Sequence, residues 1–170
     1  MADYAAVNPE FGTLKDFKAL VQQAHALGMK VIIDWVANHT AWDHVWVKQH
    51  PDWYLKNDKG EIHSFQYDNG TEVEDWSDVV GLDYSQKPLW TAMTQAMQFW
   101  VKEADIDGFR CDVAQLLPLK FWQQARAKLD ALKPMCMLAE SDNAQLHDQA
   151  FDMTYDWALQ NVLKKIAKGM

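Results

Sequence analysis

The sequence predicts an α/β fold built around a parallel sheet. Stretches with apolar residues at helical spacing alternate with short apolar runs, and acidic residues stand at the C-terminal ends of several of these runs. Alternating helix and strand patterns are typical of βαβ units, whose strands pair in parallel. The chain has 170 residues, 49% of them apolar, which is enough for one ordinary globular domain with a core.

The first helix and strand form the beginning of this pattern. Thr13 with Asp16 resembles a capping box, and Gly28 follows the last periodic position of the helix. The helical apolar positions are Leu14, Phe17, Leu20, Val21, Ala24 and Leu27. The run from Met29 to Val36 is short and rich in β-branched residues, as expected of a buried parallel strand.

Residues 41–86 differ from the rest of the chain. They are rich in Asp, Asn, Gly, His and Trp, their periodicity is weak, and turn signals recur. We predict one α/β part at 1–40 and 87–170 and an inserted loop or short subdomain at 41–86. Four of the nine tryptophans fall in this insertion, either as core residues or as flat faces for sugar rings: Trp42, Trp46, Trp53 and Trp76.

The second half of the chain repeats the helix and strand alternation. Pro88 marks the first turn of a helix that runs to about Ala104, and a strand over residues 105–114 follows. Pro118 begins another helix, with Leu119, Trp122, Leu129 and Leu132 expected to face inward. The remaining predicted elements are a strand at Met135 to Ala139, a short strand at Phe151 to Tyr155 and an amphipathic helix at Trp157 to Lys168.

Composition narrows the function classes. The formal charge of −8 and the absence of a Lys/Arg-rich run argue against nucleic acid or an anionic membrane as a partner, so a neutral ligand is expected. Cys111 and Cys136 have no metal-ligand spacing, and we interpret them as small buried apolar residues. We see neither a signal peptide nor a membrane span, and localisation is left open.

Three acids stand at or near the ends of predicted strands: Asp34, Asp112 and Glu140. Sites in parallel α/β proteins lie at the C-terminal ends of the strands. Glu140 follows Asp112 by 28 positions, about one strand-helix repeat, so neighbouring strands would bring the two carboxylates together. A structural role for any one of these acids is equally good on its own, but the three together favour a site.

The stretch D-I-D-G-F-R-C-D-V-A at 105–114 suggests how the acids divide their roles. Side chains alternate along a strand, so Arg110 and Asp112 share one face, and the guanidinium would favour the ionised, nucleophilic form of the carboxylate. Glu140 follows an apolar run with no cation nearby in sequence, so burial would help it to hold a proton. Asp105 and Asp107 are expected to be solvated at the start of the strand. Two carboxyl groups in different environments are typical of glycoside hydrolysis.

The motifs resemble those of the α-amylase family of retaining glycoside hydrolases. The similar segments are V-N-P-E-F-G-T at 7–13, D-W-V-A-N-H at 34–39, G-F-R-C-D-V-A at 108–114 and L-A-E-S around Glu140. The resemblance implies a partial (βα)8 TIM barrel, approximately strands three to six with their helices, and a short domain B inserted after the third strand. It also implies an α-glucan substrate such as starch or maltooligosaccharides.

The same resemblance assigns roles to five residues. Asp112 is the implied nucleophile, Glu140 the general acid/base and Arg110 the residue that positions and ionises Asp112. His39 would contact a sugar hydroxyl beside the cleaved bond, and Asp34 would belong to the same network. Retention of configuration through a covalent glycosyl-enzyme would follow from this arrangement.

Two departures from the family pattern limit the expectation. Gln115 and Leu116 stand where many members carry Lys and His, which weighs against the family's calcium site, so we expect no required cofactor and no metal ligands. No counterpart of the family's third acid precedes Met170. We therefore expect weak or absent hydrolysis by this chain alone and self-association of an open half-barrel.

Three interpretations stay open at this stage. The first is the catalytic core of an α-glucan hydrolase, and the second is a non-catalytic fragment that binds glycans or assembles with other chains. The third is an unrelated parallel α/β enzyme, which ranks last because no Gly-rich phosphate loop follows a strand. Substrate length, linkage preference and the choice between hydrolysis and transglycosylation are not determined by the sequence.

Overall fold

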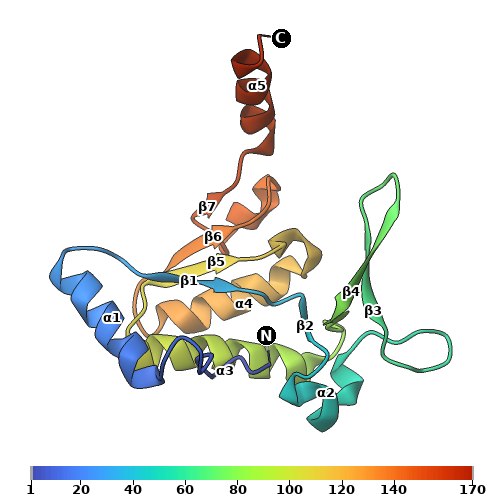
Figure 1. Cartoon of the computed structure of the whole chain (residues 1–170), viewed down its shortest axis with the longest axis horizontal. Helices are drawn as coiled ribbons and strands as arrows, with labels where there is room; N and C mark the ends of the chain where they lie inside the picture. Colours follow the sequence, from blue (N-terminus) through green and yellow to red (C-terminus); the bar gives the residue numbers. More distant parts are fainter. Residues whose placement is uncertain (1, 170) are drawn as a thin grey trace.

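The computed structural model describes residues 2–169 and is organised around a four-stranded parallel sheet (Figure 1). The strand order is β1-β5-β6-β7. The strands are β1 (Ile32–Trp35), β5 (Gly108–Cys111), β6 (Cys136–Ala139) and β7 (Met153–Thr154). The predicted α/β class with a parallel sheet is confirmed, and each strand is shorter than the run predicted for it.

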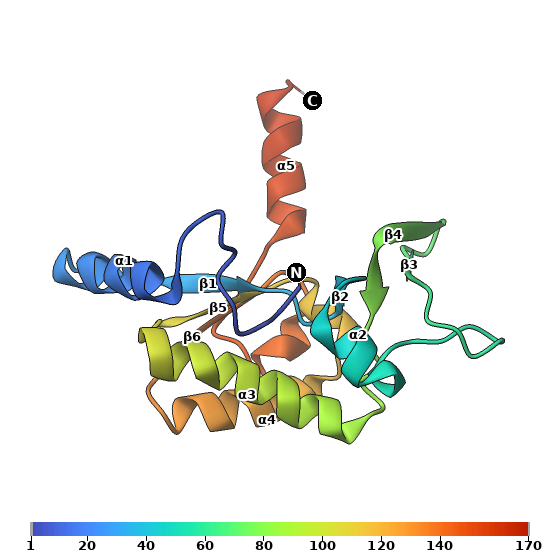
Figure 2. The same ribbon diagram turned by 60° about the horizontal axis from the view of Figure 1, so that its bottom comes forward.

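Two helices cover one face of this sheet. Figures 1 and 2 show α3 (Lys87–Ala104) and α4 (Leu119–Asp130) side by side beneath the strands. Both helices are amphipathic and bury their apolar sides. Their buried residues include Leu89, Met93, Met97, Trp100, Phe121, Trp122 and Leu129. Leu132 was predicted to face inward, but it lies just beyond α4 and 40% of it is exposed.

Alternation along the strands separates a core face from a polar face. Trp35, Phe109 and Met137 are buried on the side of α3 and α4. Asp34 and Arg110 are paired in the register of β1 and β5, and alternation places both on the opposite side of the sheet. Figure 1 shows no helix over that side of the sheet within residues 2–169. Cys111 is buried, whereas Cys136 is only half-buried, so the prediction of two buried cysteines holds for the first alone. The polar face is therefore the surface on which chemistry can occur.

The first and last helices expose more apolar surface than the sequence suggested. Helix α1 (Leu14–Ala26) begins with the predicted capping box of Thr13 and Asp16, but Val21 is its one buried residue. Helix α5 (Trp157–Ala167) projects away from the sheet in Figures 1 and 2. Its exposed apolar residues are Trp157, Leu159, Val162, Leu163 and Ile166. No helix among the described residues is long and apolar enough to cross a membrane.

A second, antiparallel sheet has the order β2-β4-β3. It consists of β2 (His39–Ala41), β3 (Ser64–Asp68) and β4 (Val73–Gly81), and the short helices α2 (Val45–Gln49) and η1 (Pro51–Trp53) lie between β2 and β3. Trp53 is buried and Trp46 packs against it and Tyr4, so these two tryptophans are core residues. Figure 1 shows the β3–β4 hairpin standing away from the parallel sheet.

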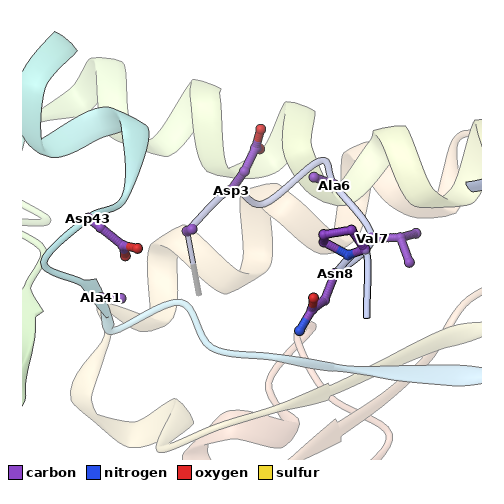
Figure 3. Close-up of a pocket in the computed structure, with 8 residues that line it drawn as sticks. Asp3, Ala6, Val7, Asn8, Ala41 and Asp43 are labelled. Carbon is purple, nitrogen blue, oxygen red and sulfur yellow. The ribbon is translucent and has the colours of Figure 1, made fainter. Parts of the chain in front are cut away.

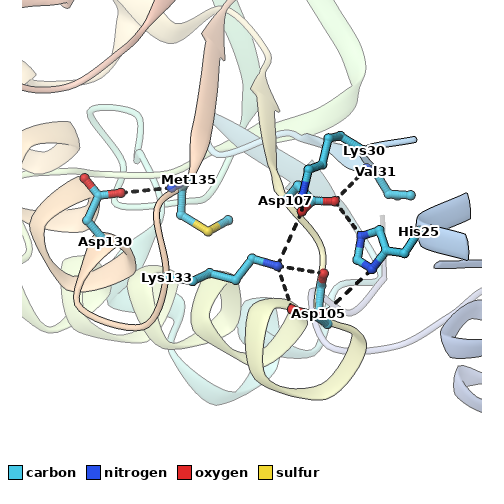
Figure 4. Close-up of polar contacts among 8 residues, drawn as sticks. All are labelled: His25, Lys30, Val31, Asp105, Asp107, Asp130, Lys133 and Met135. Atoms are coloured by element: carbon cyan, nitrogen blue, oxygen red, sulfur yellow. Dashed lines mark hydrogen bonds and ion pairs between the residues drawn. The ribbon is translucent and has the colours of Figure 1, made fainter. Parts of the chain in front are cut away.

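A polar cluster ties the N-terminal ends of the strands together, and it corrects the prediction that Asp107 is solvated. Asp107 is buried, and its carboxylate accepts a hydrogen bond from Val31 N at 2.9 Å and binds His25 Nε2 at 2.7 Å and Lys30 Nζ at 3.0 Å (Figure 4). Burial alone would raise the pKa of Asp107, but these hydrogen bonds and the charge of Lys133 hold it well below the ordinary value.

Two short 3-10 helices complete the chain between the parallel strands. They are η2 (Ala114–Leu116), directly after β5, and η3 (Ala144–His147), between β6 and β7. Each follows a strand that carries a candidate acid at its end. The residues that follow β5 and β6 are therefore held in compact turns.

Candidate active site

The register of the parallel sheet places three acids at one end of neighbouring strands. Asp34 on β1 is aligned with Arg110 on β5, and Cys111 is aligned with Ala139 on β6. Asp112 directly follows Cys111, and Glu140 directly follows Ala139. Their backbone N–H groups continue the ladder, with Asp112 N donating to Trp35 O at 3.0 Å and Glu140 N donating to Cys111 O at 2.9 Å. The ladder thus fixes both acids at the same level along the strand direction, at the C-terminal ends of β5 and β6.

Arg110 joins all three carboxylates through its guanidinium. Its Nη1 lies 2.8 Å from Asp34 Oδ1 and 2.7 Å from Asp112 Oδ1, and its Nη2 lies 2.8 Å from Glu140 Oε1. Burial alone would lower the pKa of Arg110, but the bonds to Asp34, Tyr155 and Asp112 raise it above the usual value. The guanidinium is therefore a permanent positive charge at the centre of the acid cluster.

The contact between Arg110 and Glu140 corrects one prediction. The sequence placed no cation near Glu140, because the five residues before it are apolar. The structure brings Arg110 to Glu140 across the strand pair, since β5 and β6 are adjacent and in register. The two acids therefore do not have the divergent surroundings that the sequence suggested, and both bind the same cation.

A strained residue positions Glu140 from the other side. Val113 has a φ of 39° and a ψ of 44°, a left-handed conformation that β-branched residues rarely adopt. Its N–H donates to Glu140 Oε2 at 3.1 Å. Glu140 is thus held by Arg110 through one oxygen and by the backbone through the other. Backbone strain of this kind is found at functional sites, where surrounding contacts maintain it.

His39 is the first residue of β2 in the second sheet. The charge of Asp112 acts on its ring, while its ring centroid lies 5.5 Å from that of Trp76 and 6.2 Å from that of Phe65. Burial lowers the pKa of His39, and the charges of Asp112 and Asp78 oppose this effect only in part. A neutral imidazole that both donates and accepts hydrogen bonds is therefore present near Asp112 at neutral pH.

Tyr155 is a member of the cluster that the sequence analysis missed. Arg110 Nε donates to Tyr155 Oη at 3.2 Å. Tyr155 follows β7 by one residue, just as Asp112 follows β5 and Glu140 follows β6. The rule that sites gather at the C-terminal ends of parallel strands would have found it, but the prediction extended the strand through Tyr155 and considered only acids.

A separate cavity lies away from these acids. It has a volume of about 520 Å³ and is formed between the N-terminal segment and the loop after β2 (Figure 3). Its lining includes Asp3, Val7, Asn8, Ala41 and Asp43, and none of the five predicted site residues. Within residues 2–169, no group of three or more His, Cys, Asp or Glu side chains is placed to hold a metal ion.

Comparison with known proteins identifies the family. The profile of the α-amylase catalytic domain matches residues 1–168. The chain belongs to the α-amylase family. This confirms the resemblance read from the motifs at the strand ends.

Solved structures of α-amylases share the fold. The chain is 41% identical to a maltogenic α-amylase from Thermotoga neapolitana, with a TM-score of 0.87, covering 99% of this chain and 38% of that one. It is 39% identical to an α-amylase from Lactobacillus plantarum, with a TM-score of 0.86, covering 99% of this chain and 42% of that one. The parallel sheet and its helices therefore correspond to part of an α-amylase barrel, as predicted.

A curated relative has a related activity. The α-1,4-glucan:maltose-1-phosphate maltosyltransferase of Rhodospirillum rubrum is 34% identical over 142 residues, which cover 81% of this chain and 20% of the relative. The chain thus spans about a fifth of this relative and about two fifths of the solved α-amylases.

Proposed function

We propose that this chain carries the two-carboxylate core of an α-amylase-type retaining glycoside hydrolase that acts on starch or maltooligosaccharides. The observation that supports it best is the arrangement around Arg110. Its two terminal nitrogens bind Asp112 and Glu140, which come from adjacent parallel strands. Two carboxyl groups separated by one guanidinium lie close enough together to act on the same glycosidic bond.

The proposed reaction has two steps. In the first, a carboxylate oxygen of Asp112 attacks the anomeric carbon while Glu140 gives a proton to the departing glycosidic oxygen. The sugar is then bonded to Asp112, and Glu140 is ionised. In the second step Glu140 takes a proton from water, the water oxygen bonds to the anomeric carbon, and the bond to Asp112 breaks. Each step inverts the carbon, so the configuration is retained overall.

Arg110, His39 and Asp34 have supporting roles in this proposal. Arg110 orients Asp112, because its Nη1 donates a charge-assisted hydrogen bond to Asp112 Oδ1 at 2.7 Å. His39, neutral and close to Asp112, would bond a hydroxyl of the sugar under attack. Asp34, 62% of whose side chain is exposed, accepts a second hydrogen bond from Arg110 Nη1.

The ion pair with Arg110 also predicts weak activity for the chain by itself. An acid catalyst must turn an oxygen towards the glycosidic oxygen, whereas both oxygens of Glu140 are engaged, Oε1 by Arg110 and Oε2 by Val113 N–H. Glu140 must leave Arg110 before it can protonate a glycosidic oxygen. Substrates that need no proton at the leaving group would avoid this requirement.

A fluoride substrate tests the proposal directly. Fluoride leaves without protonation, so 5-fluoro-α-glucosyl fluoride or its maltosyl counterpart would form a glycosyl-enzyme without Glu140 acting as the acid. We expect mass spectrometry of peptides to find one added sugar on Asp112, and Asp112→Asn to remove it. Addition of the sugar at another residue, or equal labelling of Asp112→Asn, would refute the assignment.

A second candidate function is a fragment that binds glycans or associates without catalysis. The apolar residues exposed on α5 and the uncovered face of the parallel sheet favour it. The uncovered face carries Asp34 and Arg110 of the acid cluster, whereas α5 carries none of its members, so association through α5 is separable from catalysis. Binding of maltooligosaccharides without any labelling of Asp112 would favour this alternative over the first.

A further inference from the structure

Tyr155 reaches Arg110 from the end of β7. Arg110 Nε donates to Tyr155 Oη at 3.2 Å, and the guanidinium carbon lies 5.8 Å from the centre of the tyrosine ring. Tyr155 directly follows Thr154, which is aligned with Ala139 in the register of β6 and β7. The parallel register thus places Tyr155 at the level of Glu140, on the next strand of the sheet.

The chain around Tyr155 is held on both sides. Thr154 before it is the last residue of β7, and Asp156 after it caps α5, with Asp156 Oδ1 accepting a hydrogen bond from Leu159 N at 2.8 Å. The half-buried tyrosine ring meets the ring of Trp157 edge to face, with centroids 5.1 Å apart. A hydroxyl on a side chain restrained in this way is a fixed acceptor for the N–H of Arg110.

The contacts of Arg110 divide between two edges of its planar guanidinium. Nη1 donates to Asp34 Oδ1 and Asp112 Oδ1. Nε and Nη2 lie along the other edge, where Nε donates to Tyr155 Oη and Nη2 forms the ion pair with Glu140 Oε1 at 2.8 Å. Tyr155 and Glu140 therefore support the same edge of the cation.

We propose that Tyr155 is a positioning residue that keeps Arg110 against the nucleophile while Glu140 is away from it. The inference rests on the proposed function, in which Glu140 leaves Arg110 to protonate the glycosidic oxygen. After that departure Tyr155 still holds the edge formed by Nε and Nη2. Without the tyrosine hydroxyl the guanidinium would be free to pivot about Nη1, and small displacements of a group in an active site lower rates strongly.

Asp34 is a weaker support for Arg110 than Tyr155. Its side chain is 62% exposed, so water screens its charge. It also binds Nη1, the atom about which the guanidinium would turn, and a bond at the pivot does not prevent the rotation. The Tyr155 hydroxyl acts on the opposite edge, where a single hydrogen bond is sufficient to set the plane of the cation.

Two other roles for Tyr155 have to be separated from positioning. The ring packs against Trp157, so its loss would lower stability, and a hydroxyl at a strand end is also placed to bond a sugar. Tyr155→Phe keeps the ring and removes the hydroxyl. Tyr54→Phe is the matched control, because it removes a hydroxyl that bonds Thr40 Oγ1 at 3.0 Å outside the acid cluster.

The test measures the rate at which the fluoride substrate labels Asp112 at a series of concentrations, in the parent chain and in Glu140→Ala. Fluoride leaves without a proton, so Glu140→Ala retains the first step and imitates a site from which the acid has withdrawn. We expect Tyr155→Phe to lower the maximal rate about threefold in the parent chain and about tenfold or more in Glu140→Ala. The half-saturating concentration should be unchanged, and Tyr54→Phe should alter neither quantity.

Nuclear magnetic resonance of the Arg110 Nε–H group reports on positioning without any reaction. We expect this proton to exchange slowly with water in the parent chain and in Glu140→Ala, because Tyr155 Oη accepts its hydrogen bond in both. Exchange should become rapid when Tyr155→Phe is combined with Glu140→Ala. Arg110→Lys identifies the signal by removing it, and circular dichroism verifies that each variant is folded.

The outcomes separate this inference from the proposed function. Equal slowing of labelling in the two backgrounds, or no slowing in either, would overturn the positioning role of Tyr155. A higher half-saturating concentration at an unchanged maximal rate would also overturn it, since that result marks a sugar contact. Absence of labelling in the parent chain would overturn the proposed function. Exchange of the Arg110 proton would then still decide the positioning role, and rapid exchange in the folded parent chain would refute it.

Discussion

Arg110 Nη2 lies 2.8 Å from Glu140 Oε1, although 29 residues lie between Arg110 and Glu140 in the sequence. The same guanidinium binds Asp112 at 2.7 Å through Nη1. One cation thus serves both the proposed nucleophile and the proposed acid. This shared contact organises the site, and it also restrains Glu140 until substrate or a rearrangement separates the pair.

Replacement of Arg110 by lysine should impair formation of the glycosyl-enzyme. A single ammonium cannot bind Asp34, Asp112 and Glu140 with the geometry of a planar guanidinium. We expect the rate of labelling of Asp112 by the fluoride substrate to fall by about tenfold or more. Arg126→Lys is the matched control, because Arg126 bonds Asp130 and Asp152 outside the acid cluster. Equal effects of the two substitutions would contradict a positioning role for Arg110.

Asp107 should contribute strongly to stability. Its buried carboxylate joins α1, β1 and the turn before β6 through His25, Val31 and Lys133. We expect Asp107→Asn to lower the free energy of unfolding by about 2 kcal/mol at pH 7, measured by urea denaturation. Asp105→Asn is the control and should cost less than about 1 kcal/mol, since 68% of that side chain is exposed.

The pH dependence of this effect follows from the lowered pKa of Asp107. A lowered pKa means that the unfolded chain takes up the proton more readily than the folded one. The stabilisation is therefore complete above about pH 4, the ordinary range for aspartate, and is lost as the pH falls towards the lowered pKa. The difference between the parent chain and Asp107→Asn should shrink on going from pH 7 to pH 3. A constant difference would show that the charge of Asp107 is not responsible.

Chelation should leave the fold unchanged. We predict no structural calcium, because Gln115 and Leu116 replace the Lys and His of the family motif. The melting temperature with EDTA should equal that with millimolar CaCl₂. A higher melting temperature in calcium would reveal a site, since a ligand that binds the folded state stabilises it by mass action.

The chain should associate with itself through exposed apolar surface. Leu163 and Ile166 on α5 are 56% and 64% exposed, and α5 projects from the body of the molecule. We expect the mass from light scattering to rise with concentration and Leu163→Lys to reduce this rise. Gln160→Lys adds the same charge to the same helix and should have a smaller effect. A constant monomer mass at all concentrations would contradict the prediction.

Local chemistry made much of this fold predictable. The capping box at Thr13, the proline near the start of α3 and the apolar periodicities placed the helices within a few residues. The acids at the ends of short apolar runs indicate the site from the sequence alone. These features depend on neighbours in the chain, so periodicity and spacing are sufficient to read them.

Tertiary structure decided the rest, because contacts between strands join residues that are distant in sequence. Only the register of β5 with β6 brings Arg110 to Glu140, and only the end of β7 brings Tyr155 to Arg110. Asp107 is solvated or buried according to where His25 and Lys133 lie, which the local sequence does not determine. The sequence by itself determined the family, the elements and the acids. The fold decided which charges share a partner, since pairing energy depends on distance in space.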